Sequence, residues 1–486
     1  MRNFVDFGKF IAMLIASLFI FSCGSSDQQG LTPWHTFYGS NTDERAYGVA
    51  VDNADNVYIV GRSISTWDGP AGQLPLNPHS SSGTAQDIVV LKLDKNGAYL
   101  WHTFYGTTDY TDYARGVAID ENNNVYISGF SLNSWDGPGS EAPLHAYTGL
   151  GEDSDGNAFV LKLDKDGVYQ WHTFYGSGTD YEDDRGIALD GDANVYLAMK
   201  SYDTWNFGTT KPLHDYSGST DLTIVKLDKD GAYQWHTFYG STDDDECNSI
   251  AVDSNANVYV TGYSTSTWDV DTTAPLHGHS GGEDITVLKL DKDGVYQWHT
   301  FYGSAAQDEG NGIALDTSGN VYVTGFSADT WNAGTATPLH AYAGNHDIMV
   351  FKLNSAGTYQ WHTFYGSASA NDYGNDLVID NDGSIYIVGR SLSSWQSGDG
   401  DNPLHGYTGG EDIMNLKLDT NGNYRWHTFY GSATNDRGQD IALDSRGFIH
   451  TAGYSDNTWL RDNNSEPLHS YSGSYDMFDL CIAGRW

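Results

Sequence analysis

Histidine recurs in this sequence inside a repeated seven-residue phrase, and imidazole is the commonest metal ligand among protein side chains. The phrase Trp-His-Thr-Phe-Tyr-Gly-Ser begins at Trp34 and occurs seven times, with Thr as the last residue of the second copy. Its histidines are His35, His102, His172, His236, His299, His362 and His427. A metal site would need several of them at one ion. One histidine per repeat unit cannot supply that, so we expect each to be a hydrogen-bonded structural residue.

A second set of aromatic and imidazole side chains lies in long polar stretches, such as the 25 residues between Gly61 and Asp87. Each stretch carries one tryptophan: Trp67, Trp135, Trp205, Trp268, Trp331, Trp395 and Trp459. Six continue as Pro-Leu-His, with His145, His214, His277, His340, His405 and His469, whereas the first reads Pro75-Leu76-Asn77. Two interpretations stay open. The Trp faces, with His and Asp at their edges, form up to seven similar sugar-stacking pockets, or Trp, Pro and Leu pack each loop onto its own unit.

Carboxylates form a third set with the same period. Every unit has an acid five residues before the first apolar residue of one strand-like segment: Glu44, Asp112, Glu182, Asp245, Asp308, Asp372 and Asp436. If this segment lines the axis of a ring, the acids surround one mouth of a central channel. Neighbours about 8 Å apart then repel by about 2 kcal/mol at an effective dielectric near 20. Either an axial Ca²⁺ offsets this repulsion, or each carboxylate accepts backbone N–H groups where the chain turns into the strand.

The elements that must position these residues are short β-strands. In the fifth unit, Gly312–Asp316 and Asn320–Gly325 are apolar, β-branched runs joined by a turn, which predicts a hairpin. A second hairpin joins Asp284–Leu290 to the next copy of the Trp phrase. No amphipathic helical pattern lies between the runs. Each unit of 63 to 70 residues is therefore expected to contain four strands.

Four antiparallel strands cannot bury both faces alone, so the seven units must stack, and stacking around an axis closes the array. We predict an all-β protein: a seven-bladed β-propeller of four-stranded antiparallel blades over residues 34–486. The chain enters this region on a fourth strand at Trp34 and ends after a third strand, Asp476–Ala483. We expect the N-terminal strand to pair into the last blade, because that pairing removes two exposed edges.

The order of motifs in each unit is an acid, Gly-Ile-Ala-x-Asp, Gly-Asn-Val-Tyr-Val-Thr-Gly, Asp-Ile-x-Val-x-Lys-Leu and the Trp-bearing strand. This order resembles the bacterial seven-bladed β-propeller repeat family (SBBP), over roughly Trp34 to Ala483. The resemblance implies a propeller fold and a place outside the cytoplasm, and it brings little assigned biochemistry. Two departures stand out: Met199 replaces the Gly that closes a second strand, and Asn157 replaces the Asp that opens a third.

The first 23 residues have the pattern of an export signal. Their apolar run, from Phe10 to Phe21, is too short to span a bilayer, and the sequence Ile20-Phe21-Ser22-Cys23 resembles a lipobox. We expect a signal peptide over residues 1–23, acyl chains on Cys23 and a flexible tether over residues 24–33. The protein would then lie at a bacterial outer membrane or cell surface and touch the membrane only through this anchor. The alternative is a plain secretory signal cut nearby.

The charge and the cysteines limit the partners. A formal net charge of -40 opposes binding to nucleic acid or to anionic lipid surfaces. Cys247 and Cys481 occupy non-equivalent points of the repeat, so we expect neither a disulfide nor a cysteine metal site.

The copies are close to identical, whereas an enzyme on a propeller needs unlike residues that converge at the axis. No nucleophile elbow and no Walker loop stands out against the repeat. We therefore expect no catalysis, and no cofactor unless the acids bind Ca²⁺. The expected function is that of a monomeric, surface-tethered binding protein, whose ligand is a carbohydrate or a partner protein at the long-loop face. The alternatives are a Ca²⁺-dependent, lactonase-like hydrolase with an axial site and a purely architectural envelope protein.

Overall fold

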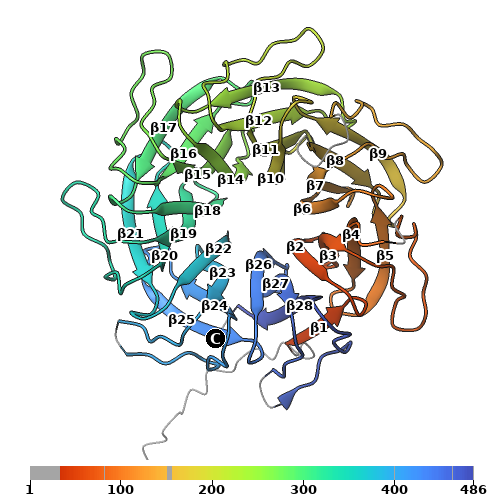
Figure 1. Cartoon of the computed structure of the whole chain (residues 1–486). Helices are drawn as coiled ribbons and strands as arrows, with labels where there is room; N and C mark the ends of the chain where they lie inside the picture. The colour runs from red at the N-terminus through yellow and green to blue at the C-terminus, as the bar shows by residue number, and fades with distance from the viewer. Residues whose placement is uncertain (1–32, 81–82, 150–155, 399, 462–463, 485–486) are drawn as a thin grey trace, which may run out of the picture. The chain divides into compact units, whose positions relative to one another are not determined.

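Seven four-stranded antiparallel sheets are arranged around a central axis (Figure 1). The computed structural model describes residues 33–80, 83–149, 156–398, 400–461 and 464–484, which belong to one compact unit beginning at Pro33. Cys23 and residues 24–32 of the expected tether lie outside these residues. The seven-bladed β-propeller predicted from the sequence is confirmed. Within the described part of the chain, no helix is long and apolar enough to cross a membrane.

Each blade has four strands, which we call first to fourth from the axis outwards. The innermost strands are β2 (Glu44–Val51), β6 (Asp112–Ile119), β10 (Glu182–Leu189), β14 (Asp245–Val252), β18 (Asp308–Leu315), β22 (Asp372–Ile379) and β26 (Asp436–Leu443). The second strands are β3 (Val57–Ser63), β7 (Val125–Ser131), β11 (Val195–Ser201), β15 (Val258–Ser264), β19 (Val321–Ser327), β23 (Ile385–Ser391) and β27 (Phe448–Ser455).

The third and fourth strands complete the blades. The third strands are β4 (Asp87–Leu93), β8 (Asn157–Leu163), β12 (Asp221–Leu227), β16 (Asp284–Leu290), β20 (Asp347–Leu353), β24 (Asp412–Leu418) and β28 (Asp476–Ala483). The outermost strands are β5 (Tyr99–Tyr105), β9 (Tyr169–Tyr175), β13 (Tyr233–Tyr239), β17 (Tyr296–Tyr302), β21 (Tyr359–Tyr365), β25 (Tyr424–Tyr430) and β1 (Trp34–Tyr38). We number the blades 1 to 6 from β2–β5 to β22–β25, and blade 7 contains β26, β27, β28 and β1.

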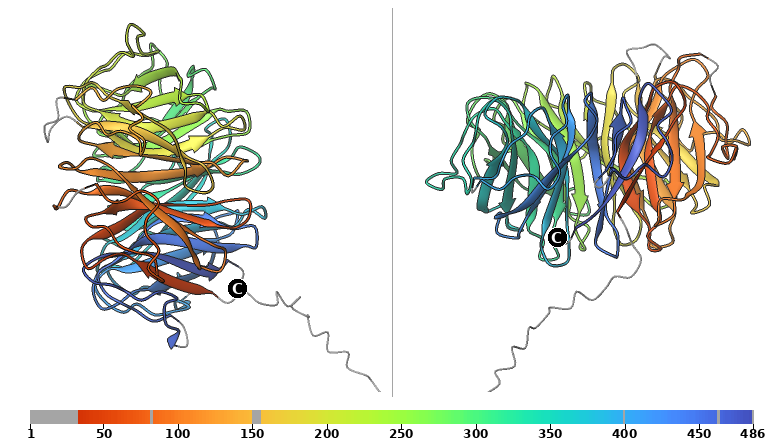
Figure 2. Two further views of the ribbon diagram at one scale, coloured as in Figure 1. Left: turned by 90° about the vertical axis from the view of Figure 1, so that its right-hand side faces the viewer. Right: turned by 90° about the horizontal axis from the view of Figure 1, so that it is seen from below.

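The core lies between neighbouring blades, which stand face to face around the ring (Figure 2). Val60 and Val90 of blade 1, for example, pack in one buried cluster with Ile127 and Phe159 of blade 2. The second and third strands are buried on both faces, which explains their continuous apolar, β-branched sequences. A blade cannot bury these faces alone, so the ring is the smallest closed unit that satisfies them.

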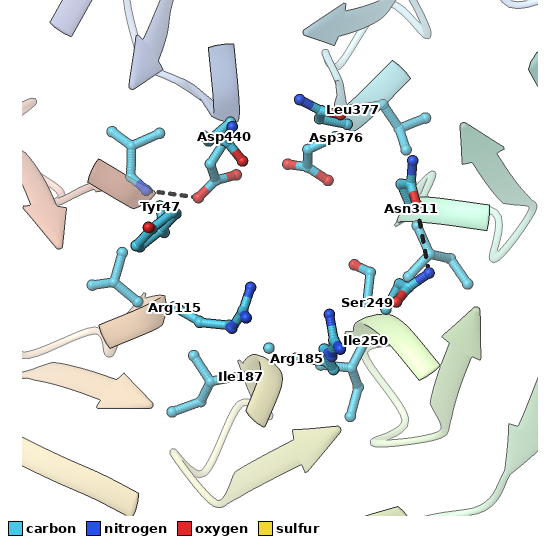
Figure 3. A pocket seen from close by; sticks show the side chains of 18 residues that line it. Tyr47, Arg115, Arg185, Ile187, Ser249, Ile250, Asn311, Asp376, Leu377 and Asp440 are labelled. Atoms are coloured by element: carbon cyan, nitrogen blue, oxygen red, sulfur yellow. Dashed lines mark hydrogen bonds between the residues drawn. The ribbon is translucent and has the colours of Figure 1, made fainter. Parts of the chain in front are cut away.

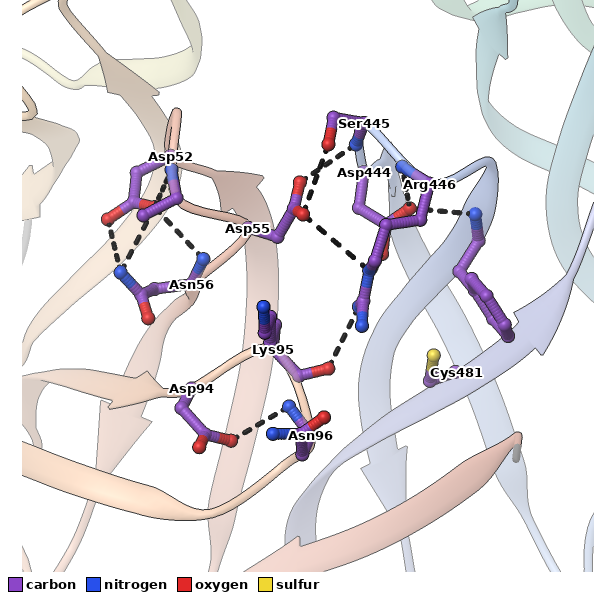
Figure 4. Close-up of polar contacts among 12 residues, drawn as sticks. Asp52, Asp55, Asn56, Asp94, Lys95, Asn96, Asp444, Ser445, Arg446 and Cys481 are labelled. Atoms are coloured by element: carbon purple, nitrogen blue, oxygen red, sulfur yellow. Dashed lines mark hydrogen bonds and ion pairs between the residues drawn. The ribbon is translucent and has the colours of Figure 1, made fainter. Parts of the chain in front are cut away.

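The N-terminal strand closes the ring, as expected. Strand β1 pairs antiparallel with β28, with Trp34 opposite Cys481 and Tyr38 opposite Met477. On the face that carries the tight hairpins, polar contacts join blade 7 to blade 1 (Figure 4). There Ser445 donates its backbone N–H to Asp55 at 2.9 Å, and Arg446 donates to the carbonyl of Lys95 at 2.8 Å.

The two faces of the ring differ in their connections. Tight turns join the first strand to the second and the third to the fourth, as at Asp52–Asn56 and Asp94–Ala98. The long loops between the second and third strands begin on the opposite face, where the crossovers between blades also lie.

Candidate functional site

Every innermost strand contains a β-bulge at its fourth residue. In β2, Ala46 pairs with Gly61 and Gly48 pairs with Val60, so Tyr47 between them has no partner. A bulge of this kind re-aims one side chain away from the regular alternation of a strand. The same shift occurs in all seven innermost strands. The bulged residues are Tyr47, Arg115, Arg185, Asn248, Asn311, Asn375 and Gln439, and all of them line an axial cavity.

The axial cavity has a volume of about 270 Å³ and a polar wall. The blades repeat one another almost everywhere, yet at the bulge they present Tyr, Arg, Asn or Gln. The residue after the bulge also differs, since Asp376 and Asp440 stand in blades 6 and 7 where blade 1 has Gly48. Figure 3 shows Arg115 and Arg185 on one side of the channel and the two aspartates on the other.

The arginine side of the channel is only partly neutralised. Arg115 Nε lies 3.4 Å from Asp183, and Arg185 Nη2 lies 3.0 Å from the same carboxylate and 3.6 Å from Glu246. Arg115 also stacks on Tyr113, with its guanidinium carbon 5.2 Å from the ring centroid. Its side chain keeps 32% of its surface exposed, so the guanidinium is held in place and remains open to a ligand.

The aspartate side consists of two interacting carboxyl groups. Asp440 accepts the backbone N–H of Val49 from blade 1 at 2.6 Å, and Asp376 lines the cavity from the neighbouring blade. Burial in the ring, followed by the charge of Asp440, raises the pKa of Asp376 well above its ordinary value. Burial also raises the pKa of Asp440. Both carboxyl groups therefore hold a proton more tightly than an exposed aspartate does.

Three asparagines brace the arc between these two sides. Asn248, Asn311 and Asn375 each donate an amide N–H to the carbonyl of a residue in the next innermost strand, at 3.1, 3.0 and 2.6 Å. These bonds fix each amide relative to the neighbouring blade. Asn248 also donates to Oδ1 of Asn311 at 3.5 Å, so these two amides are linked along the channel wall.

The channel widens into a second hollow of about 320 Å³ on the long-loop face, lined by Glu309, Phe326, Tyr373 and Arg390 together with the bulged residues of blades 2 to 7. Six of the nine arginines among the described residues lie close to a bulge. Each is the bulged residue itself, the residue two positions before it, or the second-strand residue that pairs with the latter. They are Arg45, Arg62, Arg115, Arg185, Arg390 and Arg437. The arginines, in contrast to the lysines, are thus concentrated on this part of the two inner strands.

The long loops do not form the predicted tryptophan pockets. Their seven tryptophans keep only 4 to 6% of their surface exposed. Each ring stacks on the histidine of the Trp phrase in the same blade, with centroids 3.8 to 4.3 Å apart. Since both faces of the indole are covered by protein, a sugar cannot stack there in this structure. The other interpretation, in which the tryptophan packs the loop onto its own blade, agrees with the geometry.

The Pro-Leu-His segments run along the outer edge of the blades. In blade 4, Leu276 donates its N–H to the carbonyl of His299, and Phe301 donates to the carbonyl of His277. All six loop histidines point Nδ1 at the carbonyl of the same phenylalanine position, at 2.6 to 2.8 Å. In blade 1 the amide of Asn77 makes this bond to Phe104 at 2.7 Å. Both His and Asn thus bond the same carbonyl of the outermost strand. This indicates that the segment covers the exposed edge of that strand.

The histidines of the Trp phrase have the structural role expected of them. In blade 3, Tyr233 donates its hydroxyl proton to Nδ1 of His236 at 2.7 Å, and Nε2 donates to the carbonyl of Trp205 at 3.0 Å. Burial lowers the pKa of these imidazoles to about 4, as for His102 and His236, so they are neutral at physiological pH. In the part of the chain that the structure describes, no three His, Cys, Asp or Glu residues form a group that could hold a metal ion.

The seven acids do not surround the channel, and their predicted axial ring is wrong. Each lies fully buried in the crossover between two blades, and none lines the cavity. Six of them accept the backbone N–H of the Ser or Thr that ends the Trp phrase, as Asp308 does from Ser304 at 2.7 Å. They therefore cap the turn into the innermost strand, which is the second of the two roles considered above.

A second buried acid faces six of these seven caps. It opens the third strand of the preceding blade, and the Gly of the Trp phrase separates the two carboxyl groups. A Cβ on Gly240 would meet Asp221 Oδ1 at 2.8 Å and Asp245 Oδ2 at 2.9 Å. Burial, followed by the charge of Asp245, raises the pKa of Asp221 to about 7. In the seventh pair, Asn157 replaces the Asp. Because Asn resembles a protonated Asp, this replacement favours pairs that share a proton over pairs that bind a cation.

The residues that sequence reasoning missed are the bulged ones. The Trp phrase and its acids are nearly the same in every copy, and these residues stabilise the blades and their junctions. The opposite signal was available: between the acid and the Gly-Ile-Ala motif, the copies read Tyr47, Arg115, Asn248 or Gln439 at one aligned position. Variation at a single position of an otherwise uniform repeat marks where the blades meet unlike surroundings.

Comparison with protein families identifies the repeat. Residues 100–133, 234–267, 297–327 and 360–394 match the family model of the beta-propeller repeat SBBP. Each match covers the same part of the unit, from an outermost strand across a blade junction to the second strand of the next blade.

Individual proteins are more distant. An uncharacterized WD repeat-containing protein of Acanthamoeba polyphaga mimivirus is 23% identical over 435 residues, and the match covers 75% of this chain and 30% of the viral protein. The crystal structure of the polysaccharide lyase Uly1 covers 95% of this chain and 94% of its own at 8% identity, with a TM-score of 0.46. A gluconolactonase of Xanthomonas campestris covers 74% and 95% at 12% identity, with a TM-score of 0.32. Similarity at this level carries no inference about ligand or activity. Four stretches of the chain thus match the SBBP beta-propeller repeat, and the chain as a whole has the seven-bladed β-propeller fold.

Proposed function

We propose that this protein is a binding protein, held at the surface of a bacterial envelope by a lipid on Cys23, whose ligand site is the axial channel. The observation that carries the proposal is the set of unlike side chains at the seven bulges, where otherwise repeated blades converge on one cavity of about 270 Å³. Pockets for small ligands combine a concave wall with a few fixed polar groups. Arg115, Arg185 and the braced asparagines supply such groups here.

The geometry favours the axis over the long loops. Ligand stacking on the loop tryptophans would require these buried rings to leave their histidine partners, whereas the axial guanidinium of Arg115 is already exposed to the channel. The channel also widens towards the long-loop face, the side on which a ligand was expected from the sequence. A small polar ligand, or a polar group at the end of a larger carbohydrate or protein, fits this opening.

A thermal-shift screen of sugars, organic acids and amino acids tests the proposal. Compounds that bind at the axis should raise the melting temperature of the protein and lose this effect in an Arg115→Gln/Arg185→Gln variant. An Arg425→Gln variant is the matched control, because Arg425 lies exposed on the outermost strand β25, away from the channel. A ligand whose effect survives the axial changes but disappears in a His277→Ala/His340→Ala variant would instead place the site in the loops.

A further inference from the structure

The axial channel carries opposite charges on opposite sides. Arg115 and Arg185 come from blades 2 and 3, and Asp376 and Asp440 come from blades 6 and 7, across the ring (Figure 3). Neighbouring groups of opposite charge would neutralise each other directly, as surface ion pairs do. Here the cavity separates them, so a molecule in the channel would meet both at once.

The arginine side of the channel supplies two guanidinium groups. Its cations are Arg115, Arg185 and Lys200, and their acidic partners are Asp183 and Glu246. Both guanidinium groups share Asp183, and the Arg115 side chain keeps 32% of its surface exposed.

The aspartate side of the channel supplies two carboxyl groups. Asp376 and Asp440 come from neighbouring blades and both line the cavity, and an ammonium group beside them favours their ionised form. Asn311 and Asn375 line the same cavity, and each uses one of its two amide N–H groups on the neighbouring blade. Carboxyl groups in such a polar wall are a suitable environment for an ammonium group.

From these two sides we infer that the axial channel binds a small zwitterion, a molecule with a carboxylate and an ammonium group such as an α-amino acid. The carboxylate lies against Arg115 and Arg185, which offer the planar donor pairs that suit it. The ammonium group lies against Asp376 and Asp440. The cavity volume of about 270 Å³ is at the lower limit of ligand pockets, which restricts the ligand to a few heavy atoms. This inference rests on the axial site proposed above and names its ligand class.

Calorimetric titration of the full chain with three matched probes tests the inference. L-serine carries both charges, ethanolamine lacks the carboxylate, and glycolate lacks the ammonium group. We expect L-serine to bind at least tenfold more tightly than either of the others. An Asp376→Asn/Asp440→Asn variant should lose this preference over glycolate, and an Arg115→Gln/Arg185→Gln variant should lose the preference over ethanolamine. The Arg425→Gln variant should behave as the unmodified protein does.

The outcomes separate this inference from the proposed function. If glycolate binds as tightly as L-serine and the arginine variant abolishes both, the channel is an anion site: the zwitterion is refuted and the axial site stands. If sugars bind at the axis and none of the three probes does, the zwitterion is again refuted. If no compound of any class responds to the axial changes, both proposals fail. The comparison of probes on the unmodified protein decides the inference even if the aspartate variant does not fold.

Discussion

The carboxyl pairs between blades should make the protein more stable in mild acid than in mild alkali. Burial, followed by the charge of Asp245, raises the pKa of Asp221 from 3.8 to about 7. A carboxyl group whose pKa is higher in the folded state binds its proton more tightly there. Its stabilising effect is complete below the unfolded pKa and is lost as the pH rises through the folded one. For one such group, the loss between pH 5 and pH 8 is about 3 kcal/mol.

An Asp221→Asn variant isolates this contribution. It reproduces the arrangement between blades 2 and 3, where Asn157 faces Glu182. The amide oxygen can still accept the N–H of Ser217, which Asp221 accepts at 2.8 Å. We expect little change in stability at pH 5 and a stabilisation at pH 8 that approaches the lost 3 kcal/mol. The reciprocal Asn157→Asp variant adds a carboxyl group beside Glu182 and should lower stability at pH 8 more than at pH 5.

Melting temperatures of the three proteins between pH 5 and pH 8 provide the measurement. An Asp215→Asn variant controls for the loss of one negative charge, since Asp215 is exposed in the long loop of the same blade. The informative quantity is the change in melting temperature with pH. If Asp221→Asn and Asp215→Asn alter this dependence equally, the buried pair does not bind a proton as argued, and the reasoning fails.

Four further changes test other parts of the structure. Deleting residues 24–40 removes β1 and should lower the melting temperature by many degrees or cause aggregation; an unchanged melting curve would contradict closure by this strand. Gly240→Ala places a methyl group against two carboxylates and should destabilise the protein at every pH in the same assay. Gln439→Tyr copies blade 1 into blade 7 at the bulge and should leave the melting temperature within about 2 °C of the original, because the side chain lies in the open channel. Cys23→Ser should abolish labelling by a palmitate analogue in cells, and persistent labelling would exclude the anchor at this residue.

The propeller could be predicted from the sequence because two independent signals agreed. The period of the Trp phrase gave the number of blades, and alternation of apolar runs with turns gave four strands in each. The end of the chain on Asp476–Ala483, one strand short of a blade, then left a single place for Trp34–Tyr38. Each step depends only on backbone hydrogen bonding and burial, which the sequence pattern expresses directly.

The site could not be predicted in the same way, because its geometry depends on a bulge. In a regular strand, the side chains of Arg115 and Arg185 would point to the side that strict alternation gives them. No local sequence signal predicts an unpaired residue between Ala114 and Gly116. The acids were misplaced for the same reason. Asp112 lies three residues before the bulge, and only the tertiary fold shows that it faces the neighbouring blade instead of the axis.

The bulge also explains how a uniform scaffold can hold unlike functional groups. The phrase residues, the capping acids and the paired carboxyl groups are enclosed on all sides, so a change in one of them disturbs a blade junction. The bulged residue has no ladder partner, and its side chain lines the channel. Tyr47 and Arg185 therefore occupy the same backbone position without altering the blades around them. Stability and ligand choice thus depend on separate residues of one repeat, and a ring of seven such positions can present a different chemistry on each side of its axis.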